Sequence, residues 1–179
     1  PVTGLDHIDL HTCKKVGIKV ISLKGEIDFL KDIRATAELT IALMLSLLRN
    51  LIKATDSVKN LNWDRDLFRG RELNDNTVGI VGMGRLGNIV ADILTGFGAK
   101  IIAYDIKNFK NDSLENADTL IELVEKSNII SVHVDYNIDN HQMFNSNVFS
   151  HFKEGSIFIN TSRGSLVDEY ALLDLSLIH

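Results

Sequence analysis

Residues 77–87, which read TVGIVGMGRLG, constrain the possible folds of this chain more than any other segment. A short apolar run leads directly into the pattern G-x-G-x-x-G, and residues 85–95 continue with apolar side chains at helical spacing. Further along, the apolar run 100–104 ends in Asp105. A strand, a glycine turn, a helix, a second strand and a terminal acid in this order are typical of a dinucleotide-binding unit. The segment therefore predicts an α/β fold that binds a nicotinamide cofactor.

The three glycines of this pattern have separate expected roles. Gly82 permits the tight turn after the strand, Gly84 lets the backbone approach a pyrophosphate, and Gly87 lets the helix pack against the strand. The helix that begins near Arg85 directs backbone N–H groups and a positive dipole end at the phosphates. Asp105 can accept hydrogen bonds from both adenosine ribose hydroxyls, and its charge disfavours a 2′-phosphate, so NAD is predicted rather than NADP. The alternative is an ordinary strand–turn–helix connection with incidental glycines.

From residue 77 onward, predicted strands and helices alternate. We expect strands at 78–81, 100–104, 129–134 and 156–160, and helices at 85–96, 116–126, about 145–151 and 166–175. Such alternation predicts a doubly wound parallel sheet of the Rossmann type, with helices on both faces. Ligands of such sheets bind at the carboxyl ends of the strands. This singles out Gly82, Asp105, residues 133–136 and residues 161–163.

The part of the chain before residue 77 has a different pattern. Residues 5–9 are expected to open a short helix, and residues 18–22 to form a strand. Residues 35 to about 60 are predicted to be one long helix, with an apolar stripe at Leu39, Leu43, Leu47 and Leu51. Apolar side chains cover so much of this helix that we expect it to be buried on more than one side. It is either a core helix or a helix that joins two domains and packs across a dimer.

Charge and cysteine content exclude several classes of function. The length of 179 residues suits one domain, or one domain plus part of another. A net charge of -5 argues against nucleic acid or an anionic membrane as a partner. The single cysteine, Cys13, fits a reducing compartment, so we expect a cytoplasmic protein. The most apolar segment, 39–48, is too short to cross a bilayer. His7 and His11 have no second ligand set near them in the sequence, and no metal is predicted.

Several segments together resemble one enzyme family. The most specific is INTSRGSLVDE at 159–169. The others are TGLDHID at 3–9, AELT at 37–40, the glycine pattern, and SVHV at 131–134. On these segments the chain resembles the D-isomer-specific 2-hydroxyacid dehydrogenases, the family that includes D-3-phosphoglycerate dehydrogenase. The resemblance implies an NAD-dependent oxidoreductase that acts on the CH–OH group of a small 2-hydroxy acid.

The resemblance also implies roles for individual residues. Arg163 would bind the substrate carboxylate and keto oxygen, and it is the one catalytic residue predicted in this chain. A guanidinium fork suits this role because it holds a carboxylate with two hydrogen bonds and stabilises negative charge on the substrate oxygen. The alternative for Arg163 is a cap on a surface loop. Arg85 and Leu86 would offer backbone N–H groups to the pyrophosphate. The other residues expected to line the cofactor are Thr3, reaching across a cleft, with His133, Val134, Thr161 and Ser162.

The family transfers a hydride between C4 of nicotinamide and the substrate's C2, with a histidine as acid/base and a glutamate tuning the pKa of that histidine. In the family these two residues follow the segments matched here, and His179 lacks the proline–histidine context of the catalytic histidine. We read His133 as structural or cofactor-lining. We therefore expect a remnant of the substrate domain and hinge at 1–34, and an incomplete NAD-binding domain at 35–179 that is inactive as a fragment.

Two other functions remain open from the sequence. One is an NAD(H)-sensing binding protein, similar to the corepressors that share this fold. The other is a domain that folds and binds nothing. In the enzyme and the corepressor alike, the helix at 35–51 predicts a homodimer. The substrate stays open, in part because Asp135-Tyr136 stands where the family usually has Pro-Leu after the equivalent of His133.

Overall fold

A computed structural model describes residues 3–109, 111 and 113–177. The chain divides into two compact units, Pro1–Ile33 and Arg34–His179, which we treat separately. The boundary between these units is one residue from the expected domain boundary. The assignment of the first unit to a substrate domain stays a prediction, and His179 lies outside the described residues.

The first unit contains two short helices, α1 (Leu10–Lys15) and α2 (Ile27–Leu30). Helix α1 begins at Leu10, just after the expected residues 5–9, because the Asp9 side chain caps it by accepting a hydrogen bond from the backbone N–H of Thr12 at 2.9 Å. The strand predicted at 18–22 is wrong, since these residues join no sheet. A β-branched run becomes a strand only where a neighbour supplies the ladder hydrogen bonds, and the described part of this unit supplies none.

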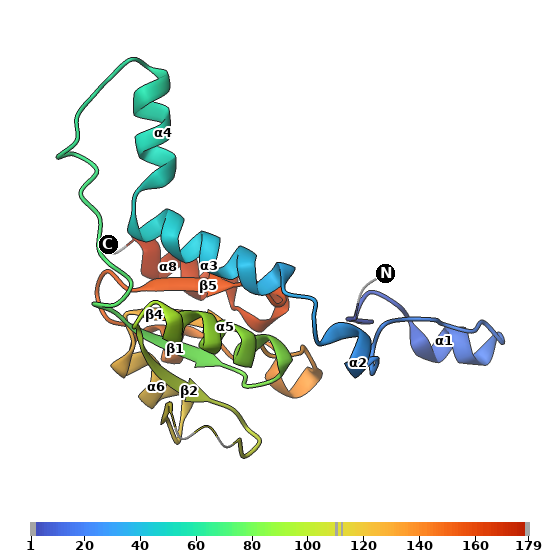
Figure 1. Ribbon diagram of the computed structural model, residues 1–179. Helices are drawn as coiled ribbons and strands as arrows, with labels where there is room; N and C mark the ends of the chain where they lie inside the picture. The colour runs from blue at the N-terminus through green and yellow to red at the C-terminus, as the bar shows by residue number, and fades with distance from the viewer. Residues whose placement is uncertain (1–2, 110, 112, 178–179) are drawn as a thin grey trace. The chain divides into compact units, whose positions relative to one another are not determined.

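The second unit is built on a five-stranded parallel sheet with the order β3-β2-β1-β4-β5 (Figure 1). Its strands are β1 (Thr77–Val81), β2 (Lys100–Tyr104), β3 (Glu115–Asn116), β4 (Ile129–Val132) and β5 (Ile157–Asn160). The chain winds outward from β1 to β3 and then returns to the other side of β1. Because the winding direction reverses between β1 and β4, ligand binding is expected at the carboxyl ends of these strands. The predicted Rossmann-type sheet is confirmed.

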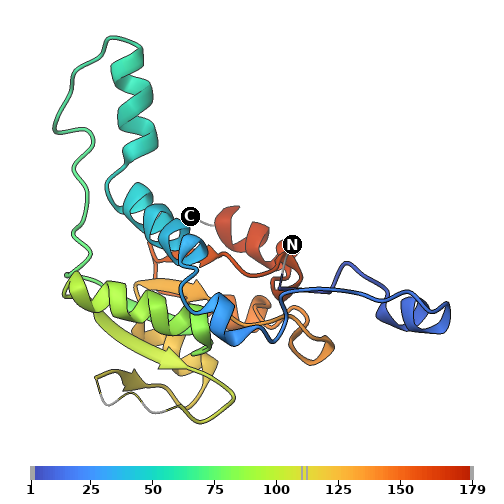
Figure 2. The same cartoon turned by 45° about the vertical axis from the view of Figure 1, so that its right-hand side comes forward.

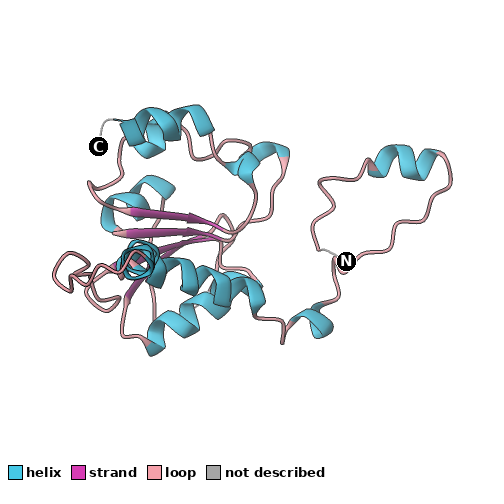
Figure 3. Ribbon diagram, turned by 90° about the horizontal axis from the view of Figure 1, so that it is seen from above, coloured by secondary structure: helices cyan, strands magenta, loops and turns pink. Residues whose placement is uncertain are grey.

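Helices cover both faces of this sheet (Figure 3). On one face lie α3 (Ala35–Leu48) and α5 (Arg85–Gly96); on the other lie α6 (Leu120–Lys126), α7 (Ser146–Phe149) and α8 (Glu169–Leu177). The first core layer includes Met44, Val78, Ile80, Leu94, Ile129 and Ile159. The second includes Ile102, Leu123, Ile130, Phe144, Phe149 and Leu166. Strands buried on both faces explain why the sequence shows continuous apolar runs rather than alternation.

Several predicted helix boundaries shift for local reasons. The helix expected at 116–126 begins only at Leu120, because the Thr119 side chain caps it by accepting from the N–H of Glu122 at 3.1 Å. The helix expected at 166–175 follows a 3₁₀ turn, Gly164–Leu166, and starts at Glu169. A second 3₁₀ turn spans Ile138–Asn140. The helix expected at 85–96 has the predicted bounds.

The single helix expected from residue 35 to about 60 is wrong. Helix α3 ends at Leu48, and α4 (Leu51–Lys59) begins after Asn50, which has a left-handed backbone conformation with φ +52°. Asparagine is one of the few residues that adopts this conformation readily, and the chain changes direction there. Helix α4 projects away from the sheet, and residues 60–76 return from its tip (Figures 1 and 2).

The predicted leucine stripe is not buried. The core-facing side of α3 consists of Ala37, Thr40, Ile41, Met44 and Leu48. The stripe leucines are 53%, 40%, 51% and 48% exposed at positions 39, 43, 47 and 51. Of the helices in the described ranges, no single one is long and apolar enough to cross a membrane; a bent pair, 27–48 with 51–59, passes that test of length and composition.

Candidate cofactor site

Four strands of the sheet end at the same level. Their register aligns the last residues of β2, β1, β4 and β5, which are Tyr104, Val81, Val132 and Asn160. The ladder continues for one residue: the Gly82 N–H donates to the Tyr104 carbonyl at 2.8 Å, and the His133 N–H donates to the Val81 carbonyl at 2.7 Å. The residues that follow the strands are therefore neighbours, and we call them the rim: Asp105, Gly82, His133 and Thr161.

Gly82 and Gly87 both sit where a side chain cannot be accommodated. Gly82 has φ +97°, and a Cβ there would lie 2.7 Å from Val134 Cγ1 and 2.8 Å from the His133 carbonyl carbon. This closeness also places Val134 beside the glycine turn. A Cβ on Gly87 would run into the carbonyl oxygen of Gly82. Gly82 therefore makes the tight turn, and Gly87 brings α5 against it.

Gly84 differs from its two neighbours in the pattern. It is the residue that precedes α5, and a Cβ there would meet nothing within 4 Å. The space beside Gly84 is therefore open, and α5 starts there with Arg85 and Leu86, both half-buried. The first N–H groups of a helix have no partner within the helix and carry its positive dipole end. The open space at Gly84, its backbone without a side chain and the N-terminus of the 12-residue helix α5 together suit the binding of a pyrophosphate.

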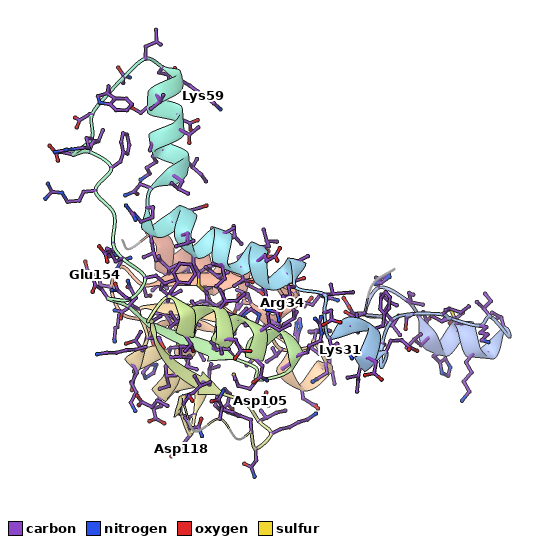
Figure 4. All side chains as sticks on the ribbon, viewed as in Figure 1. Lys31, Arg34, Lys59, Asp105, Asp118 and Glu154 are labelled. Atoms are coloured by element: carbon purple, nitrogen blue, oxygen red, sulfur yellow. The ribbon has the colours of Figure 1, made fainter. Side chains whose placement is uncertain are left out.

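The Asp105 carboxylate holds the glycine turn in place. Its Oδ2 accepts from the Met83 N–H at 2.7 Å, and its Oδ1 accepts from the Lys107 N–H at 2.9 Å. Figure 4 labels Asp105 at the end of β2. An ionised carboxylate has about four acceptor positions, so both oxygens can still accept from ribose hydroxyls. The sequence reasoning missed the bond to Met83, which depends on β1 and β2 being neighbours.

His133 is held neutral. Its Nε2 lies 2.8 Å from Ser131 Oγ, and its buried Nδ1 has no hydrogen-bond partner among the described residues. Burial lowers the pKa of His133 to about 4, because the charged imidazolium would lose its hydration. At neutral pH the imidazole is therefore in its neutral form, which is a poor general acid, and this agrees with reading it as structural or cofactor-lining.

Residues 160–163 form a loop closed by its own hydrogen bonds. The Asn160 side chain accepts from the Ser162 N–H at 2.9 Å and donates to the Arg163 carbonyl at 2.8 Å. The Ser162 hydroxyl donates to the Val132 carbonyl at 3.0 Å, which ties the loop to β4. The half-buried Arg163 guanidinium donates through Nη1 to the Ser162 carbonyl at 2.9 Å. The loop thus holds Arg163 at the same sheet edge as the glycine turn.

Thr161 makes a contact that the sequence did not predict. Its hydroxyl lies 2.9 Å from the hydroxyl of Thr40, which is fully buried in α3. The two residues are 121 positions apart, so no local pattern could pair them. The one indication in the sequence is that Thr40 and Thr161 each belong to a segment that resembles the family, AELT and INTSRGSLVDE respectively.

The structure brings together Gly82, Gly84, Arg85, Leu86, Gly87, Asp105, His133, Val134, Thr161, Ser162 and Arg163 at one sheet edge. Thr3 belongs to the first unit, and its contact with the cofactor stays a prediction. Over the described ranges, no group of three or more His, Cys, Asp or Glu side chains could hold a metal ion.

Comparisons with known proteins agree on one family. Residues 41–176 match the family model described as D-isomer specific 2-hydroxyacid dehydrogenase, NAD binding domain. The D-lactate/D-glycerate dehydrogenase of Pediococcus acidilactici is 38% identical over 176 residues, which are 95% of this chain and 50% of that protein. The hydroxypyruvate reductase of Thermotoga maritima is 36% identical over 171 residues, 96% of this chain and 54% of that protein.

Solved structures give the same result. The D-lactate dehydrogenase of Aquifex aeolicus, complexed with NAD and lactic acid, matches with a TM-score of 0.86 and 37% identity. The match covers 99% of this chain and 53% of that one. The chain therefore spans about half the length of the relatives that it matches.

Proposed function

Because the chain belongs to the D-isomer specific 2-hydroxyacid dehydrogenases and contains their NAD-binding domain, we propose that its protein is an NAD-dependent oxidoreductase of a small 2-hydroxy acid. The reaction is hydride transfer between nicotinamide and C2 of the 2-hydroxy or 2-keto acid. The observation that carries the proposal is the rim: one sheet edge holds the glycine turn, Asp105 and the loop of Arg163.

Each part of the rim has a chemical task. The open space at Gly84 and the start of α5 would hold the pyrophosphate, and Asp105 the adenosine ribose. Bound NAD would supply the hydride acceptor. Arg163 would hold the substrate carboxylate and stabilise negative charge on the substrate oxygen. The lowered pKa of His133 makes its imidazole a poor proton donor at neutral pH, which supports leaving it out of the proton transfer. We assign proton transfer to residues outside the present chain, as the family resemblance implies.

We further propose that the protein is a cytoplasmic homodimer, with neither nucleic acid nor membrane as a partner. The exposed leucines of α3 support the dimer, because Leu39, Leu43 and Leu47 leave an apolar strip of this helix uncovered. The net charge of -5 and the single cysteine support the other two points. The corepressor-like alternative has no support from the relatives described above, whose names are those of dehydrogenases and a reductase.

NADH titration of the 179-residue chain tests cofactor binding. We expect saturable binding, followed by NADH fluorescence, and much weaker binding of NADPH. A screen of 2-keto acids with the complete gene product tests catalysis, and there Arg163→Lys should lose most turnover because an ammonium cannot reproduce the guanidinium fork. Absence of NADH binding by the chain would overturn the proposal, and near-normal turnover of Arg163→Lys would remove Arg163 from the reaction.

A further inference from the structure

We propose that Thr40 is a positioning residue for the rim: through its hydroxyl it orients Thr161, and with it the loop that carries Arg163. The inference rests on the function proposed above, because it assigns a residue to that same site. Thr40 lies in α3, on a different element from every rim residue, and within hydrogen-bond distance of the loop.

The direction of the hydrogen bond follows from counting protons. The Thr40 hydroxyl lies 2.8 Å from the Thr36 carbonyl oxygen, and a carbonyl oxygen can only accept. The single hydroxyl proton of Thr40 therefore points back along its own helix. The 2.9 Å contact with Thr161 must then use the Thr161 proton, with Thr40 as the acceptor. The Thr36 carbonyl thus orients the Thr40 hydroxyl, and the Thr40 oxygen in turn orients the Thr161 hydroxyl.

The position of Thr40 makes this contact specific. Its neighbours on the core-facing side of α3 are apolar, namely Ala37, Ile41, Met44 and Leu48. Packing against these apolar neighbours does not require a hydroxyl, and a buried hydroxyl is costly unless it is hydrogen-bonded. Valine has nearly the same shape and would fill the same space. The hydroxyl is explained by the bond that it accepts from the loop.

The Thr40–Thr161 contact adds to the hydrogen bonds that hold the loop of residues 160–163. Asn160 closes the loop internally, and Ser162 ties it to β4. Thr161 lies between these two residues, and its side chain is held by α3, which covers one face of the sheet. The loop therefore has anchors on two elements, and losing the α3 anchor should loosen Thr161 and Arg163 without unfolding the sheet.

Thr40→Val and Thr40→Ser, compared in the 179-residue chain, test this inference. We measure the NADH dissociation constant, amide hydrogen exchange of residues 161–163 without cofactor, and the melting temperature. For Thr40→Val we expect about fivefold weaker NADH binding and about fivefold faster exchange, because a change of about fivefold corresponds to the loss of one hydrogen bond. Thr40→Ser retains the hydroxyl and should restore both to within about twofold. Thr95→Val is the control for the loss of a within-helix hydroxyl bond, because the exposed Thr95 hydroxyl donates to the Ala91 carbonyl at 2.9 Å and to no other group among the described residues.

Thr161→Val removes the other partner, so the test holds even if Thr40→Val does not fold. In the double variant the two effects should not add, since both single variants remove the same bond. Unchanged exchange and NADH affinity in Thr40→Val, or equal changes in Thr95→Val, would overturn the inference. If the wild-type chain binds no NADH, the proposed function fails, while the exchange experiment still decides whether Thr40 holds the loop.

Discussion

Gly84 and Gly87 lie one helical turn apart, yet a methyl group at each would meet opposite surroundings. At Gly87 it would run into the Gly82 carbonyl, and at Gly84 it would enter open space. Gly87→Ala should therefore cost roughly 1–3 kcal/mol of unfolding free energy. Gly84→Ala should melt like the wild type but bind NADH at least about tenfold more weakly, if the pyrophosphate lies there. Urea unfolding and NADH titration separate the two effects. Gly96→Ala, in the same helix and also facing open space, is the control.

Asp105 has two tasks at the residue scale, and its variants should show both. Its carboxylate accepts from Met83 and Lys107 and is expected to bind the ribose. Asp105→Ser should weaken NADH binding about tenfold or more and narrow the difference between NADH and NADPH, because it removes a charged acceptor beside the 2′ position. Titrations with both cofactors check this, with Asp92→Asn, an exposed carboxylate on α5, as the control. Unchanged affinity for both cofactors would contradict the role of Asp105.

The lowered pKa of His133 predicts how the free energy of unfolding depends on pH. Its folded-state pKa of about 4 is below the usual value of 6.5, so between these values the unfolded chain takes up a proton that the folded chain does not. Its contribution to stability is therefore intact above about pH 6.5 and declines as the pH falls toward 4. The loss amounts to about 2 kcal/mol at pH 5. Urea unfolding at pH 7 and pH 5 should show this loss in the wild type and a smaller one in His133→Gln. Equal losses in both would contradict the assignment.

At the scale of elements, the junction of α3 and α4 depends on one residue. Asn50 has φ +52°, and its side chain donates to the Arg69 carbonyl at 3.4 Å. Asn50→Val should cost roughly 1–3 kcal/mol, because a β-branched residue is strained in the left-handed region. Asn50→Gly should be tolerated better, since glycine carries no such strain. Thermal melts of both variants check the ranking. Asn74→Val, at an exposed turn position with negative φ, controls for the valine itself.

The elements that sequence predicted well are those whose information is local. Strand β2 and helix α5 have their predicted bounds, because an apolar run and a helical period can be read within one segment. The break at Asn50 was missed, since asparagine occurs in helices as well as in left-handed turns. The strand at 18–22 was wrong and the two-residue β3 was missed for one reason: strand formation depends on a partner elsewhere in the chain. The Thr40–Thr161 contact could not be predicted from the sequence for the same reason, since the two residues are 121 positions apart.

At the scale of the whole molecule, the exposed leucines of α3 predict how copies assemble. Replacing Leu43 and Leu47 by glutamate places charge in the middle of the proposed interface. The dimer dissociation constant should rise at least about a hundredfold, because central apolar contacts contribute most to such interfaces. Sedimentation velocity of the complete protein measures this. Ile138→Glu alters an exposed apolar residue of the 3₁₀ turn 138–140 and should leave the dimer intact. A wild type that sediments only as a monomer would exclude the dimer.

The segment that returns from the tip of α4 contains Trp63, the one tryptophan in the sequence, and its side chain is 88% exposed. The chain therefore has a built-in optical reporter on a part that projects away from the sheet (Figure 2). Indole emission shifts to shorter wavelength when water around the ring is replaced by protein. The colour of the intrinsic fluorescence would thus register coverage of this segment without any attached label.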